Sequence, residues 1–136
     1  MKTLILMFLT AALLLTGCAA ALNTEEAKAY RQISMAEAVE MMEKEENYII
    51  LDVRTEQEFA AGHIPGAILL PNETIGTKEI PQLPDKDQLI MVYCRSGNRS
   101  KQASGKLVQL GYTNIVEFGG IIDWPGETVV GTEEVV

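Results

Sequence analysis

The chain of 136 residues has room for one domain, and its hydrophobic fraction of 47% is ordinary for a globular protein. Charged residues make up 22%, a fraction that favours neither a disordered nor a fibrous protein. The formal net charge of −8 argues against nucleic acid as a partner, because proteins that bind nucleic acid usually present basic surfaces.

The chain begins with an apolar segment. Lys2 precedes an uncharged stretch over residues 3–23, and the motif "LTGC", which ends at Cys18, resembles the lipobox of bacterial lipoproteins. The resemblance predicts a signal peptide over residues 1–17, a lipid on Cys18 and a membrane-anchored domain in the periplasm or on the outer cell surface. Two alternatives stay open: an uncleaved helix, for which the stretch is long enough, and secretion without lipid. All three place the domain outside the cytoplasm.

Composition then divides the rest of the chain. Residues 18–31 are small, polar and acidic, which is typical of a tether between membrane and domain. The domain itself is expected over residues 32–130, and residues 131–136 are expected to form a frayed tail.

Two capping boxes mark helix starts. Ser34 is followed three residues later by Glu37, and Thr55 by Glu58, the spacing in which each side chain can bond to the other residue's backbone N–H. The second helix is expected to end at Gly62, because glycine readily ends a helix.

Short apolar runs alternate with these helices. Strands are expected at residues 48–53, 67–70, 89–93 and 115–118, a helix at 100–110, and a loop with one helical turn at 72–88. Such alternation predicts an α/β protein with an open parallel sheet and helices on both faces. Ligands of these folds bind beyond the carboxyl ends of the strands, where Cys94 lies.

The segment "CRSGNRS" starts at Cys94 and is the clearest functional signal. A cysteine at the end of an apolar strand can simply be a packing residue. Here Gly97 and Asn98 allow a tight turn whose N–H groups converge on one point, and a helix N-terminus follows near Ser100. Such surroundings favour a thiolate or an anion bonded to it.

Three chemistries compete for this loop. A thiol–disulfide oxidoreductase would need a second cysteine two residues after Cys94, and the sequence has none there. A cysteine-dependent phosphatase or arsenate reductase would place an arginine at position 100, but the sequence has Ser100, with Arg99 one residue earlier. The shorter loop fits one additional sulfur better than a tetrahedral oxyanion.

The segment "CRSGNRS", with "LDVRTEQEFAAGHIPGA" and "GGIIDWPGE", resembles the single-domain rhodaneses, which are thiosulfate sulfurtransferase-like proteins. The resemblance implies an open parallel sheet of about five strands and a reaction in which Cys94 becomes a persulfide. It also implies a small anionic sulfur donor such as thiosulfate and a thiol, cyanide or protein-thiol acceptor. The backbone amides of the loop would hold the transferred sulfur. These residues are Arg95, Ser96, Gly97, Asn98, Arg99 and Ser100.

The other candidate residues receive supporting roles. The Arg99 side chain would steer the donor or form an ion pair, Arg95 would add positive charge, and Asp52 and Arg54 would stabilise the loop through ion pairs and backbone bonds. His63, the one histidine, is expected to form an anchoring hydrogen bond rather than to act as a base. Trp124 is expected to pack near the pocket. With one histidine and one usable cysteine, the sequence favours no metal site. It contains no nucleotide-binding glycine motif, so no cofactor is expected.

The resemblance leaves one functional alternative open. A domain with an intact cysteine loop can be an enzyme with turnover, or it can carry or sense a persulfide for a partner with little turnover of its own.

Overall fold

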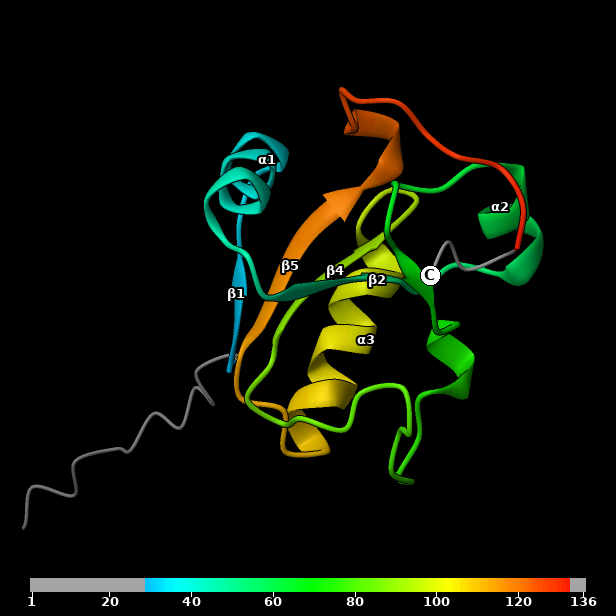
Figure 1. Ribbon diagram of the computed structural model, residues 1–136. Helices are drawn as coiled ribbons and strands as arrows, with labels where there is room; N and C mark the ends of the chain where they lie inside the picture. Colours follow the sequence, from blue (N-terminus) through cyan, green and yellow to red (C-terminus); the bar gives the residue numbers. More distant parts are fainter. Residues whose placement is uncertain (1–28, 133–136) are drawn as a thin grey trace, which may run out of the picture.

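A computed structural model describes residues 29–132, which form one five-stranded parallel sheet with the order β1-β5-β4-β2-β3 (Figure 1). The strands are β1 Tyr30–Gln32, β2 Tyr48–Asp52, β3 Ile68–Leu69, β4 Leu89–Cys94 and β5 Ile115–Gly120. The helices are α1 Met35–Lys44, α2 Glu56–Ala61 and α3 Asn98–Gln109, with short 3-10 helices η1 Asn72–Thr74 and η2 Ile121–Asp123. The predicted α/β class and parallel sheet are confirmed.

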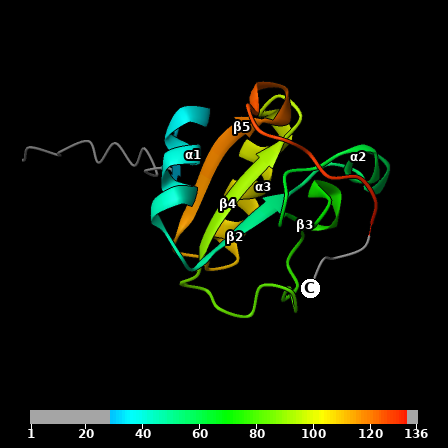
Figure 2. The same ribbon diagram turned by 45° about the horizontal axis from the view of Figure 1, so that its top comes forward.

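Helices cover both faces of the sheet (Figure 2). Side chains alternate along β4, so that Ile90, Val92 and Cys94 pack on the side of α3, while Met91 and Tyr93 pack on the side of α1 and α2. Both sets are buried, which explains why the strand is apolar along its whole length.

Both predicted capping boxes are present. The Ser34 side chain accepts from the N–H of Glu37, whose carboxylate accepts from the N–H of Ser34, and Thr55 and Glu58 form the same pair of bonds. These bonds satisfy N–H groups that the first turn of a helix leaves without partners. Helices α1 and α2 therefore start where the sequence predicted them.

Helix α3 begins earlier than predicted. Its first residue is Asn98 rather than Ser100, and Gly97 at its start has φ = +108°, in the left-handed region. Because no side chain caps this helix, the sequence carries no local signal for its start. Asn98 and Arg99, which were expected in the loop, form its first turn. The last residues of the four predicted strands differ from the observed ones by one or two positions.

Strand β1 was not predicted. It has three residues, is mostly exposed, and pairs in parallel with β5 across the expected boundary between the tether and the domain. At the other end of the domain, Gly131 donates its N–H to the carbonyl oxygen of Ala60 at 2.9 Å, so the first residue of the expected tail contacts α2.

The expected signal peptide, Cys18 and the last residues of the expected tail lie outside the described residues. Within residues 29–132, no helix is long and apolar enough to cross a bilayer.

The carboxyl ends of β2, β4 and β5 meet at one edge of the sheet. Asp52 pairs with Tyr93 across β2 and β4, and Cys94 pairs with Gly120 across β4 and β5, after a register shift between Val92 and Cys94. The three segments that carry the predicted functional residues therefore lie side by side.

Candidate active site

Cys94 is the last residue of β4, and its sulfur lies inside the turn that leads to α3. The residue is only 1% exposed. The N–H of Gly97 donates to Sγ at 3.0 Å, and the Oγ atom of Ser100 lies 3.4 Å from Sγ. The sulfur is therefore held by the loop and by the first turn of the helix.

This environment favours the thiolate. Burial raises the pKa of Cys94, but hydrogen bonds from the Ser100 hydroxyl and from the N–H groups of Ser100, Gly97 and Ser96 outweigh it and bring the pKa below its ordinary value. The predicted convergence of N–H groups on the cysteine is therefore present, through the N–H groups of Ser96, Gly97 and Ser100.

The loop lies directly on the end of β5. A Cβ atom added to Gly120 would overlap the carbonyl group of Arg95 and would lie 2.5 Å from Cα of Ser96. The N–H of Ile122 also donates to the Arg95 carbonyl oxygen, at 3.3 Å. Gly120 at the end of β5 thus makes room for the loop, a role that the sequence analysis did not assign.

Arg99 forms the ion pair that was one of its two expected roles. Its guanidinium donates to both carboxylate oxygens of Glu58, at 2.7 and 2.9 Å. This pair holds the pKa of Glu58 at about 2, well below its usual value. Glu58 therefore caps α2 and also ties α2 to α3, so Arg99 is not a free cation at the mouth of the loop.

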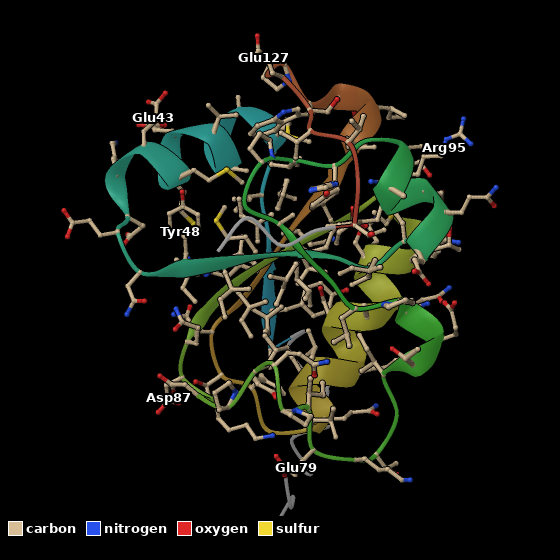
Figure 3. All side chains as sticks on the ribbon, turned by 45° about the vertical axis from the view of Figure 1, so that its right-hand side comes forward. Glu43, Tyr48, Glu79, Asp87, Arg95 and Glu127 are labelled. Carbon is tan, nitrogen blue, oxygen red and sulfur yellow. The ribbon has the colours of Figure 1, made fainter. Side chains whose placement is uncertain are left out.

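Arg95 is the exposed arginine of the loop and points away from the molecule (Figure 3). Together with Ile121 and Ile122 it lines a cavity of about 350 Å³ beside the loop, which Arg54, Glu58, Ala61, Gly62 and Thr128 also line. A second cavity of about 310 Å³ lies at the amino ends of the strands, around Arg31 and Asp87. The first cavity is the one adjacent to the cysteine loop.

Asp52 and Arg54 form a buried ion pair, with Arg54 Nη2 2.7 Å from the carboxylate. Arg54 also donates to the carbonyl oxygen of Gly62, and Asp52 accepts from the hydroxyl of Tyr93 at 2.6 Å. Tyr93 in turn accepts from the N–H of Ile64 at 3.1 Å. These bonds join the segment after β2 to the residue before Cys94, which fits the expected supporting role.

Tyr93 was missed by the sequence analysis, because an aromatic residue in an apolar strand is most simply explained by packing. Burial first, and then the charge of Asp52, raise the pKa of Tyr93, so its hydroxyl stays neutral and can donate to the carboxylate.

Glu117 was also missed. It is 2% exposed, although it carries a carboxylate, and it lies in β5 within the apolar run "IVEF". The isolated charge in that run was the signal that could have identified it, since buried carboxylates need specific partners. Its nearest partners are Ser100 Oγ, 2.6 Å from Oε1, and the N–H of Gly119, 2.9 Å from the same oxygen.

His63 forms the anchoring hydrogen bond that was predicted, with Nδ1 2.9 Å from the carbonyl oxygen of Phe59. Its ring stacks on that of Phe59, and its backbone pairs with Val129. Trp124 packs against the buried cluster on the side of α1 and α2, and its indole N–H donates to the carbonyl oxygen of Glu127. Within residues 29–132, no group of three or more His, Cys, Asp and Glu side chains could hold a metal ion.

The sequence of this chain is similar to those of known proteins. The profile of the rhodanese-like domain matches residues 34–126. A sulfurtransferase of Allochromatium vinosum is 44% identical over 82 residues, which cover 58% of this chain and 73% of the relative. The thiosulfate sulfurtransferase GlpE of Pseudomonas entomophila is 34% identical over 110 residues, 77% of this chain and 97% of the relative.

A solved structure shows the same fold. The rhodanese-like domain of an Anabaena protein, solved in solution, superposes with a TM-score of 0.66 at 27% identity, over 77% of this chain and 83% of that one.

Proposed function

This chain belongs to the rhodanese-like domain family, and the two relatives named above are sulfurtransferases. On that premise we propose that it transfers a sulfane sulfur through a persulfide on Cys94. The observation that carries the proposal is the position of the Cys94 sulfur, which accepts the N–H of Gly97 at 3.0 Å at the start of α3. N–H groups aimed at a buried sulfur stabilise negative charge on it and on a second sulfur bonded to it.

The reaction has two displacement steps. The Cys94 thiolate attacks the outer sulfur of thiosulfate, the S–S bond of the donor breaks, and sulfite leaves with the electron pair. The loop amides then stabilise the terminal sulfur of the persulfide. A cyanide ion or a thiolate attacks this sulfur, the bond to Cys94 breaks, and the Cys94 thiolate is restored. Arg95, exposed beside the cavity, supplies positive charge for an anionic donor.

The first experiment separates an enzyme from a persulfide carrier. The full chain is incubated with thiosulfate, and its intact mass is measured before and after the addition of cyanide. We expect one sulfur atom to be added and then removed, and thiocyanate to accumulate over many cycles. Loading followed by a single round of transfer would favour the carrier, whereas the absence of loading from any sulfane donor would contradict both.

The same protein provides a test against the phosphatase alternative. Because Arg99 is bound to Glu58 and the loop is one residue short of the phosphatase spacing, we expect no significant hydrolysis of small aryl phosphates. Robust hydrolysis would contradict the assignment of sulfur transfer and favour phosphatase chemistry.

We further propose that the domain is exported and anchored to a membrane through lipid on Cys18, on the strength of the "LTGC" motif after the apolar segment. Replacing Cys18 with alanine is expected to leave a precursor of full length that takes up no labelled fatty acid, because the modified thiol is missing. Two acyl chains would hold the protein firmly to the bilayer. Normal processing and labelling of this variant would rule the lipid anchor out.

A further inference from the structure

A carboxylate is buried beneath the cysteine loop, on the face of β5 that packs against α3. Glu117 is 2% exposed, and no arginine or lysine forms an ion pair with it within the described residues. Its Oε1 atom accepts from the N–H of Gly119 and lies 2.6 Å from Ser100 Oγ, while its Oε2 atom lies 3.4 Å from the amide nitrogen of Gln32. Burying a carboxylate without a cation is costly, so its hydrogen-bond partners have to stabilise it.

Ser100 links this carboxylate to the thiol. The Ser100 hydroxyl lies 2.6 Å from Glu117 Oε1 and 3.4 Å from Cys94 Sγ, and the residue is fully buried. The carbonyl oxygens of Gly97 and Gly119, at 2.9 and 3.4 Å, are further acceptors around it. Because a serine hydroxyl has a single hydrogen but can accept as well as donate, it can bridge a donor on one side and an acceptor on the other.

The same three heavy atoms accommodate two proton arrangements. In the first, the Cys94 thiol donates to Ser100, and Ser100 donates to the Glu117 carboxylate. In the second, the protonated Glu117 donates to Ser100, and Ser100 donates to the Cys94 thiolate. Each arrangement contains one negative charge and satisfies both hydrogen bonds, so no atom has to move between them.

We propose that Glu117 is a positioning residue that acts through Ser100 and holds the proton of Cys94 while the thiolate reacts. The S–H bond of Cys94 breaks as its proton passes to Ser100 Oγ, and the Ser100 O–H bond breaks as its proton passes to Glu117 Oε1. The electron pair stays on the sulfur, and the charge of the buried site does not change. This inference rests on the proposed function, since it concerns how the nucleophile of that reaction is formed.

The charged groups near the site do not take part in this proton exchange. On the thiol side, Arg99 of α3 is paired with Glu58 of α2, and Asp52 at the end of β2 is paired with Arg54. On the carboxylate side, the hydrogen-bonding side chains are Ser100 and Gln32, neither of which titrates. Helix α1, which also packs on β5, has its charged residues at exposed positions. Those residues are Glu37, Glu40, Glu43 and Lys44.

Titration of the free protein tests the proposal. The ultraviolet absorbance of the thiolate is followed against pH in the full chain with Cys18 replaced by alanine, which leaves Cys94 as its one cysteine. Two groups that share a proton titrate as a pair, so we expect the thiolate to appear in two steps. In Glu117→Gln, whose amide oxygen can still accept from Gly119 and Ser100, one step should be lost, and the remaining step should lie below the upper step of the parent protein.

Two outcomes would overturn the proposal. Identical profiles for the parent and for Glu117→Gln would mean that the carboxylate does not affect the thiol. A single step in the parent that only moves to lower pH in Glu117→Gln would indicate repulsion between the charges without a shared proton.

A pair of serines in α3 provides a matched control. Ser100 and Ser104 are both fully buried, but the Ser104 hydroxyl has no hydrogen-bond partner among the described residues. Ser100→Ala should shift thiolate formation to higher pH, because the thiolate loses its donor, whereas Ser104→Ala should titrate like the parent. Equal profiles for the two alanine variants would contradict the proposal even if Glu117→Gln were too unstable to study. Since no sulfur donor is added, failure of the titration test is distinct from failure of sulfur loading.

Discussion

Replacing Cys94 with serine is expected to abolish both sulfur loading and turnover, a loss on the order of 10³-fold or more for an essential nucleophile. Serine has nearly the shape of cysteine, and its hydroxyl can accept the Gly97 N–H that the sulfur accepts at 3.0 Å, so the loop should keep its structure. At neutral pH, however, the hydroxyl stays protonated, and without the cysteine sulfur no persulfide can form. Intact mass after incubation with thiosulfate, together with thiocyanate formation, measures both losses.

The second cysteine of the chain is the matched control. The sequence contains two cysteines. The purified Cys18→Ala variant, in detergent where needed, should load one sulfur and form thiocyanate at the rate of the parent. Unfolding by urea should show that Cys94→Ser is still folded. If Cys94→Ser still produced thiocyanate from thiosulfate, or if the added mass mapped to Cys18, the assignment of Cys94 as the sulfur carrier would be wrong.

Replacing Gly120 with alanine is expected to disrupt the cysteine loop. The backbone of Gly120 is extended, with φ = −133°, so alanine is excluded by lack of space and not by backbone strain. The new Cβ atom would overlap the Arg95 carbonyl and lie 2.5 Å from Cα of Ser96, both of which are backbone atoms that cannot rotate away. Overpacking of this kind costs about 1–3 kcal/mol, and the loop N–H groups should move away from the sulfur. Sulfur loading should therefore fall strongly.

Gly105 provides the control for this substitution. It lies in the middle of α3, and no atom lies within 4 Å of the position where its Cβ would be. Gly105→Ala should raise the free energy of unfolding by about 0.5–1 kcal/mol, because alanine favours the helix, and should leave loading unchanged. Urea unfolding and the rate of sulfur loading compare the two variants. A loading rate for Gly120→Ala equal to that of the parent would show that the close packing of β5 under the loop is not needed.

Much of the fold and part of the site could be predicted because their signals are local in the sequence. The apolar runs at β2 and β4 indicate strands covered on both faces, and the two capping boxes fix the starts of α1 and α2 within a few residues. The cysteine at the end of β4, followed by Gly97 and a helix, is likewise a continuous segment. Its chemistry could therefore be inferred from residue types and their spacing.

The tertiary structure decided which side chains meet around that segment. Strand β1 exists because β5 offers it a partner, since its own three residues carry no apolar pattern. Tyr93 reaches Asp52, and Arg99 reaches Glu58, in each case across 41 residues of sequence, while Ser100 meets Glu117 across 17. Such contacts depend on strand order, register and the packing of α3 on the sheet. Local periodicity encodes which face of an element is buried but not which residue of another element lies opposite, and for that reason the buried carboxylate beneath the thiol appears only in the folded chain.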